Sequence, residues 1–129
     1  QTYKVGDFEF QASMRHIHPV KTFGLKFNIN RTSVSLLTDT KYFEGLMDFY
    51  KTDILIICVV FSQPRPEVEH LSLVDVQTLL RAIKPKKAIL THFGMTMLRA
   101  KPQIQALELS KSLGIEVLAA YDGMTVNFP

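Results

Sequence analysis

Four residues spread along this sequence belong to the types that bind metal ions or move protons. They are His18, Asp39, His70 and His92. Three of them lie at the ends of predicted strands or just past one, and His70 comes shortly before a predicted helix. A set of histidine and aspartate side chains suits zinc or another borderline divalent cation. Such a cation can activate water and neutralise charge on a phosphoryl or acyl centre.

Some of these residues have simpler interpretations when they are taken singly. His16 and His18 would share one face of an extended strand. Such a pair either clamps a metal or forms a polar, solvent-facing edge, and the spacing alone favours the edge. Asp39, between Thr38 and Thr40, either binds a metal with support from neighbouring hydroxyl groups or caps the next helix. Taken alone, Asp39 is better explained as a cap.

Two short apolar strands must position the second half of this set. Residues 54–61 form an apolar run that is typical of a strand buried on both faces. Residues 87–91 form another, and His92 follows at its carboxyl end. Ligands of open α/β sheets gather at the carboxyl ends of the strands. His92 is therefore predicted to lie where chemistry is usually done.

A helix between these strands follows His70 closely. Ser72 is a good N-cap, and Asp75 provides the acidic partner of a capping box. Apolar residues at helical spacing then predict a helix over residues 73–83 that packs on the sheet. His70 is thus expected in the loop that enters this helix.

The remaining elements complete an α/β pattern. Alternation predicts strands, and helical periodicity between breakers predicts helices. Helices between strands indicate layered α/β architecture with right-handed crossovers. The further predicted elements are a strand from residue 8 toward 14, a hairpin of strands 24–29 and 33–37, a helix over 43–50, a helix over 102–113, and strands over 115–119 and 124–128.

Length and composition indicate one intracellular domain over residues 1–129. The net charge is +3, from 15 basic and 12 acidic residues. This mild, scattered charge gives poor support to a protein that only binds nucleic acid. The lone cysteine, Cys58, allows no internal disulfide and is expected to be buried, which makes the cytoplasm the default location. No apolar stretch is long enough to span a membrane.

Taken together, the candidate residues lie in four stretches that resemble those of a known family. The sequence resembles the second half of a metallo-β-lactamase-fold hydrolase, and is most similar to the branch with the tRNA 3′-processing endonucleases and related phosphodiesterases. The resemblance implies the C-terminal half of an αββα sandwich, with a mixed sheet and helices on one face. It rests on residues 18–24, 37–40, 70–72 and 90–93, with residues 121–124 similar to the usual ending.

The resemblance implies a role for each candidate residue. His18 and His92 would each be a terminal ligand to one of two divalent metal ions, and Asp39 would bridge the two. The ions would be zinc, with manganese or iron as alternatives. His70 would donate a proton to the leaving oxygen. His16 has no role in the family pattern and is interpreted as structural.

The sequence departs from the family pattern in three respects. The leading metal-binding signature, H-x-H-x-D-H, is absent, and in the family it belongs to the first half of the fold, which would precede Gln1. Cys58 stands where the nuclease branch has a glutamate that orients the proton donor, and Glu67 or Glu69 would have to replace it. The stretch before Asp39 holds only the predicted hairpin, without the long arm of tRNA-processing enzymes, which argues against tRNA maturation.

These departures define two hypotheses of function. In the first, the chain holds half of a dinuclear site that hydrolyses phosphodiesters or related esters, and is inactive alone. In the second, it is a non-catalytic fragment or a structural and interaction module of the same fold. The expected partners are the missing N-terminal half, a second chain or a second copy that covers a bare apolar sheet face, and a phosphodiester or nucleic-acid substrate. No membrane partner is expected.

Overall fold

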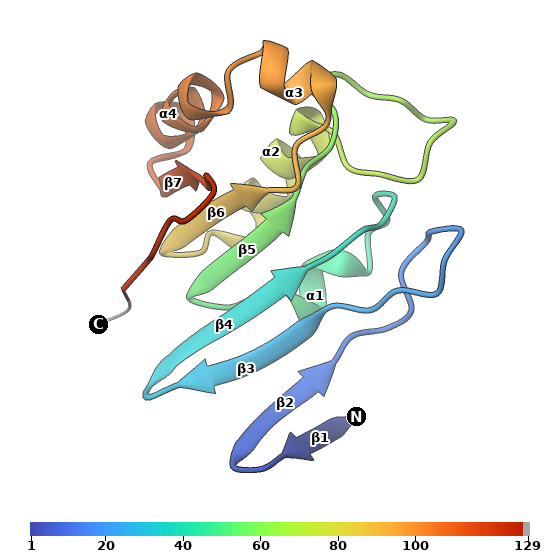
Figure 1. Cartoon of the computed structure of the whole chain (residues 1–129), viewed down its shortest axis with the longest axis vertical. Coiled ribbons are helices and arrows are strands. Elements are labelled where there is room, and N and C mark those ends of the chain that lie inside the picture. The colour runs from blue at the N-terminus through green and yellow to red at the C-terminus, as the bar shows by residue number, and fades with distance from the viewer. Residues whose placement is uncertain (128–129) are drawn as a thin grey trace.

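The computed structural model describes residues 1–127 as a single mixed β-sheet with four helices (Figure 1). The seven strands follow one another across the sheet in chain order, from β1 at one edge to β7 at the other. The elements are β1 (Thr2–Val5), β2 (Phe8–Ala12), β3 (Leu25–Ile29), β4 (Thr32–Leu37), α1 (Leu46–Phe49), β5 (Ile54–Cys58), α2 (Leu73–Ile83), β6 (Lys87–Thr91), α3 (Met95–Arg99), α4 (Pro102–Leu113) and β7 (Glu116–Ala119).

The sheet changes character at β4. Strands β1 to β4 are antiparallel and β4 to β7 are parallel. The predicted hairpin is confirmed as β3 and β4, joined by a turn in which Asn30 has φ 57°. A parallel pair requires a crossover connection, and α1, α2 and α4 lie within the three crossovers. The predicted mixed α/β architecture is therefore confirmed.

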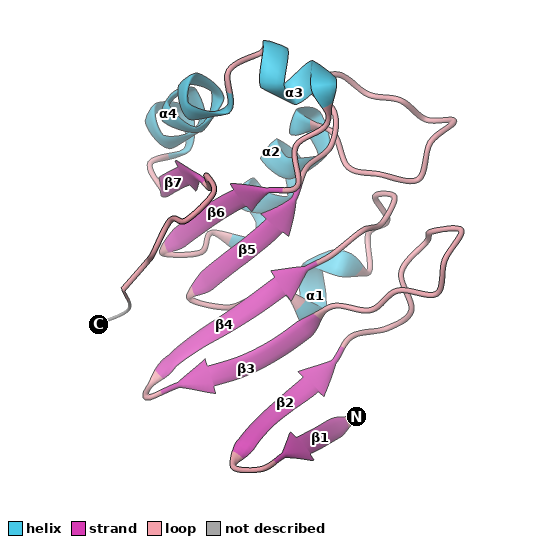
Figure 2. Ribbon diagram, viewed as in Figure 1, coloured by secondary structure: helices cyan, strands magenta, loops and turns pink. Residues whose placement is uncertain are grey.

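The main hydrophobic core lies between the sheet and the helices (Figure 2). Fully buried residues from α1, α2, α3, β5 and β6 meet there, including Leu46, Leu55, Leu79, Leu90 and Met97. A smaller cluster lies elsewhere on the sheet. It consists of Val34, Ile54 and Ile89, with the partly buried residues Phe27, Ile56, Ala120 and Val126 packed against it. Residues after β7 thus contribute to the smaller cluster.

The capping box predicted for α2 is confirmed. The Ser72 amide donates to Asp75 Oδ2 at 2.8 Å, and the Asp75 amide donates to Ser72 Oγ at 3.4 Å. The helix ends at Lys84, whose φ of 51° lies in the left-handed region. Local interactions and backbone conformation therefore define both ends of α2. The loop that carries His70 leads directly into the capped start of this helix.

Several element boundaries differ from the sequence prediction. The strand expected over 54–61 ends at Cys58, and the amides of Val60 and Phe61 bond to the Leu71 carbonyl in the following loop. Helix α1 is shorter than predicted and begins after Gly45. β1 was not predicted, whereas the strand predicted over 124–128 is wrong for residues 124–127, and Phe128 lies outside the described residues. No helix within residues 1–127 is long and apolar enough to cross a membrane.

Gly24 is the glycine whose size matters most to this fold. A Cβ atom at this position would overlap the hydroxyl group of Tyr50 and lie 2.5 Å from the Leu36 carbonyl oxygen. We expect Gly24→Ala to lower the free energy of unfolding by about 1–3 kcal/mol, as overpacked cores do. Urea denaturation measures the change. The exposed control Gly45→Ala should change it by less than about 0.5 kcal/mol, and equal effects of both substitutions would contradict the prediction.

The capping box provides a second test of the fold. Ser72→Ala removes a buried acceptor for the α2 start, so the free energy of unfolding should fall by about 1 kcal/mol. Thr78→Ala, on the exposed side of the same helix, is the matched control and should change stability little. Thermal unfolding followed by circular dichroism would decide. A Ser72→Ala protein as stable as the control would show that the cap does not set the start of α2.

Candidate metal centre

The candidate residues meet at one end of the sheet, where the parallel strands terminate. In the register of β4, β5 and β6, Leu37 pairs with Ile57, and Ile57 with Leu90. Asp39 follows Leu37 closely and His92 follows β6 directly, so both leave the sheet at the same edge. The connection between β2 and β3 and the one between β5 and α2 reach this edge as well (Figure 2).

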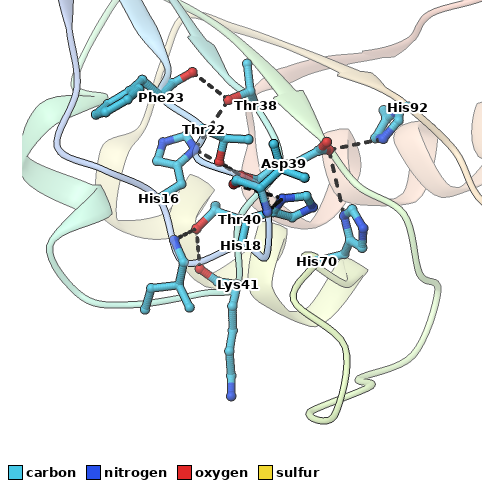
Figure 3. Close-up of polar contacts among 12 residues, drawn as sticks. His16, His18, Thr22, Phe23, Thr38, Asp39, Thr40, Lys41, His70 and His92 are labelled. Atoms are coloured by element: carbon cyan, nitrogen blue, oxygen red, sulfur yellow. Dashed lines mark hydrogen bonds and ion pairs between the residues drawn. The ribbon is translucent and has the colours of Figure 1, made fainter.

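Asp39 lies at the centre of the group, between the imidazoles (Figure 3). Its Oδ1 atom is 3.0 Å from Nε2 of His92 and 3.7 Å from Nδ1 of His70. One potential ligand atom each from His18, Asp39 and His70 lies within 4.8 Å of the others. The ring of His70 is 5.1 Å from that of His18 and 6.2 Å from that of His92, between centroids. The structure therefore brings all four predicted residues together.

The Asp39 carboxylate has an acceptor that the described residues leave unused. Oδ1 is buried and accepts no hydrogen bond within residues 1–127. The 3.0 Å separation from His92 is an ion-pair distance without the alignment of a hydrogen bond. A buried carboxylate oxygen without a partner is costly. Oxygen and imidazole nitrogen donors that converge in this way fit a borderline divalent cation.

The surroundings of His70 favour its neutral form. Burial lowers the pKa of His70, the Asp39 carboxylate opposes this, and the neighbouring His18 and His92 rings lower it further. Metal binding requires an unprotonated nitrogen, so a lowered pKa keeps the ring available to a cation. Burial also raises the pKa of the half-buried Cys58 to about 12, with Asp39 adding to the effect. Without a bound cation, Cys58 is therefore a thiol at neutral pH.

His92 is held in an unusual backbone conformation. Its φ of 63° lies in the left-handed region, which residues other than glycine seldom adopt. Such conformations cost of order 1–3 kcal/mol and cluster at functional sites. The residue directly follows β6, and its side chain is 53% exposed. The conformation turns an accessible imidazole toward Asp39 (Figure 3).

His18 presents one of its two ring nitrogens to the group. Its Nδ1 lies 3.2 Å from the Val20 amide nitrogen and 3.3 Å from the Val20 carbonyl oxygen. In the tautomer that carries hydrogen on Nδ1, this nitrogen donates to the Val20 carbonyl oxygen, and the unprotonated Nε2 can bind a cation. A ring held through its other nitrogen is the usual arrangement of a metal-binding histidine.

The structure excludes the simpler interpretations of His16 and Asp39. Asp39 does not cap α1, because the N-cap of that helix is Gly45. His16 does not form a solvent-facing edge with His18, because His16 is 3% exposed. It bonds instead to the Tyr50 hydroxyl group and the Asp39 main chain. Burial lowers the pKa of His16, and hydrogen bonding to Asp39 opposes the change.

Sequence reasoning missed the residues that support the site from behind. Thr22 and Tyr50 are the main ones, and they come from the β2–β3 loop and the end of α1. No local spacing links either residue to Asp39, so the sequence offered no signal. Neither proposed replacement for the family glutamate pairs with His70 in the described residues. Glu67 instead binds Arg65 at 2.6 Å.

Comparison with known proteins places this arrangement in a family. The model of the β-lactamase superfamily domain matches residues 1–93. An uncharacterized protein of Methanocaldococcus jannaschii is 31% identical over 109 residues, which cover 81% of this chain and 40% of that protein. The chain therefore spans well under two thirds of the length of this relative.

Solved structures show the same fold. The metallo-β-lactamase fold protein YhfI from Bacillus subtilis superposes with a TM-score of 0.80 at 20% identity, over 96% of this chain and 51% of that one. The short form of human tRNase Z gives 0.69 at 19% identity, over 98% and 46%. A diphosphatase from the PhnP family gives 0.72 at 20%, over 100% and 47%. The chain thus spans about half of each.

The match to the domain model covers most of the chain, and these three solved structures share its strand and helix arrangement. The converging histidines and the unpartnered Asp39 oxygen lie where three parallel strands of that arrangement end. This chain belongs to the β-lactamase superfamily and has the fold of its metallo-β-lactamase hydrolases.

Proposed function

We propose that this chain contributes part of a two-metal site that hydrolyses phosphodiesters or related esters. The observation that carries the proposal is the buried Asp39 Oδ1 atom, which accepts no hydrogen bond within residues 1–127 while imidazole nitrogens converge on it. The fold family supports a hydrolase. The phosphodiester class is supported by the relatives described as a tRNase and a diphosphatase.

Each residue has a proposed role. Asp39 would bridge two cations, and His18 and His92 would each bind one of them. His70 would deliver a proton to the leaving oxygen. His70 lies farther from Asp39 Oδ1 than His92 does, at 3.7 Å against 3.0 Å. Both separations fit ligands of one cation, so the separate role proposed for His70 rests on the resemblance to the nuclease branch.

The cations are proposed to be two zinc ions, with manganese or iron as alternatives. Imidazole nitrogen and carboxylate oxygen suit all three metals. The chemistry that such cations supply when bound is activation of water and neutralisation of charge at the reacting centre. Two residues of the chain have defined parts in this chemistry. Asp39 would hold the cations in position, and His70 would donate a proton to the leaving oxygen.

The remaining ligands are proposed to come from polypeptide outside these 129 residues. The sequence has only four histidines and lacks H-x-H-x-D-H. The half-exposed His92 leaves the centre accessible from one side. We propose that the polypeptide that supplies the remaining ligands packs on this side of the site. It would be either another segment of the natural chain or a second chain. The cytoplasm remains the proposed location, on the basis of the lone Cys58.

The metal site can be tested by titration. Asp39→Asn removes the central carboxylate, so zinc affinity should fall by more than about 10-fold. Removal of a residue that merely supports a ligand already lowers metal affinity by about 10- to 100-fold. Competition with a chromophoric chelator measures the affinity. Asp7→Asn, at the exposed β1–β2 turn, removes the same charge away from the site and should leave the affinity unchanged. Equal affinities for all three proteins would contradict the site.

Hydrolysis provides the test of incompleteness. With zinc or manganese and bis(4-nitrophenyl) phosphate, we expect the 129-residue chain alone to release nitrophenolate no faster than the metal in buffer. The natural protein, with all its segments and partners, should show metal-dependent turnover that is lost in His70→Ala. Turnover by the 129-residue chain alone, abolished in His92→Ala, would show that the site is already complete. No turnover by the natural protein would favour a non-catalytic module.

A further inference from the structure

A buried group of polar side chains lies behind Asp39, against its main chain rather than its carboxylate (Figure 3). His16 is at the centre of this group and is 3% exposed. The group also draws on separate parts of the chain, and Asp39 is its single member from the proposed ligand set. His16 contacts Ser13, Thr38, the main chain of Asp39, and Tyr50, and Thr22 joins the group through the Asp39 carbonyl oxygen.

The Asp39 carbonyl oxygen is held by two donors. The Thr22 hydroxyl group donates to it at 2.9 Å, and Nδ1 of His16 lies 3.1 Å away. A carbonyl oxygen has two lone pairs and can only accept. Nδ1 of His16 must therefore carry a hydrogen atom, and both acceptor positions of the Asp39 carbonyl are filled.

The other nitrogen of His16 then has a defined role. In a neutral imidazole with hydrogen on Nδ1, Nε2 is an acceptor. The Tyr50 hydroxyl group lies 2.6 Å from Nε2 and donates to it. Ser13 Oγ is farther away, at 3.3 Å, and its own hydrogen is directed at the Met14 carbonyl at 2.7 Å. The hydrogen bonds therefore run in one direction, from Tyr50 through His16 to Asp39.

Space for the Tyr50 hydroxyl group is provided by Gly24. A Cβ atom at Gly24 would overlap that hydroxyl. The Gly24 amide also donates to Ser13 Oγ at 2.8 Å, which ties the loop that carries His16 to the same group. The close approach of Gly24 is an independent observation that the position of Tyr50 is fixed.

We propose that His16 is a positioning residue for the metal centre, held by Tyr50 as the Nδ1–H tautomer and fixing the main chain of Asp39. It acts through Asp39, whose Oδ1 is thereby kept facing His70 and His92. It also anchors the loop that carries His18 two residues later. This inference rests on the proposed metal site, because positioning has meaning only if Asp39 binds a cation.

A histidine that merely fills the core would behave differently from a positioning residue. His16→Leu fills the space of the imidazole ring with an apolar side chain and removes both hydrogen bonds. His16→Asn retains a side-chain N–H near the position of Nδ1 and loses only the acceptor for Tyr50. A packing role predicts that metal affinity is unaffected by either change in the folded protein. A positioning role predicts that Asn restores what Leu removes.

The experiment combines two readouts on the wild-type chain and its variants. Imidazole nitrogen NMR of the metal-free chain reports which nitrogen of His16 carries hydrogen, and we expect Nδ1. Zinc competition titration reports affinity. We expect His16→Leu to weaken binding about 10- to 100-fold, as loss of supporting residues does, and His16→Asn to stay within about 3-fold of wild type. If His16→Leu does not fold, Tyr50→Phe is used, with Tyr3→Phe on β1 as its control.

The outcomes separate this inference from the proposed function. Hydrogen on Nε2 of His16, or wild-type affinity in folded His16→Leu, overturns the positioning role while the metal site stands. If Tyr50→Phe is the variant used, affinity below that of Tyr3→Phe supports the role, and equal affinity overturns it. If neither this chain nor the natural protein that contains it binds zinc, the proposed site is overturned, and the positioning role falls with it even if the tautomer is as expected.

Discussion

The register of the three central parallel strands is the constraint on which the site depends. Because Leu37, Ile57 and Leu90 are paired across β4, β5 and β6, the residues that follow these strands emerge at one edge. Main-chain bonds then continue past the strands, as from the Val59 amide to the Thr91 carbonyl at 2.9 Å. A one-residue slip would turn every side chain of the shifted strand to the opposite face. The buried core on the helix side makes such a slip costly, so the sheet fixes the site.

The candidate metal centre contains two features that are unfavourable for folding. Asp39 has a buried oxygen without a hydrogen bond in the described residues, and His92 has a left-handed backbone. Neither feature helps folding. Both become understandable if a cation binds between these side chains, and the hydrogen-bonded group around His16 and Tyr50 holds the Asp39 backbone in place at the same time. The sheet and the hydrogen-bonded group around His16 thus hold Asp39 and His92 in conformations that are unfavourable by themselves.

Local patterns in the sequence predicted the hairpin, α2 with its cap, and β6, because each depends on neighbours in sequence. The set of candidate residues was recognised only when four stretches were taken together and compared with the family pattern. The contact between His16 and Tyr50 could not be predicted, since it joins residues 34 positions apart without a shared periodicity. β1 was missed because its residues are all exposed and show no burial pattern. Residues 124–127 alternate as a strand would, but they pair with no strand within residues 1–127, and a strand requires a partner.

The central claim is that Asp39 and its neighbouring histidines bind a metal ion. Anomalous X-ray diffraction at the zinc edge, from crystals of this chain grown with zinc, tests it most directly. We predict an anomalous peak about 2.0–2.2 Å from Asp39 Oδ1, and also within bonding distance of at least one nitrogen of His18 or His92. Ordered zinc elsewhere on the protein, with none beside Asp39, would contradict the account.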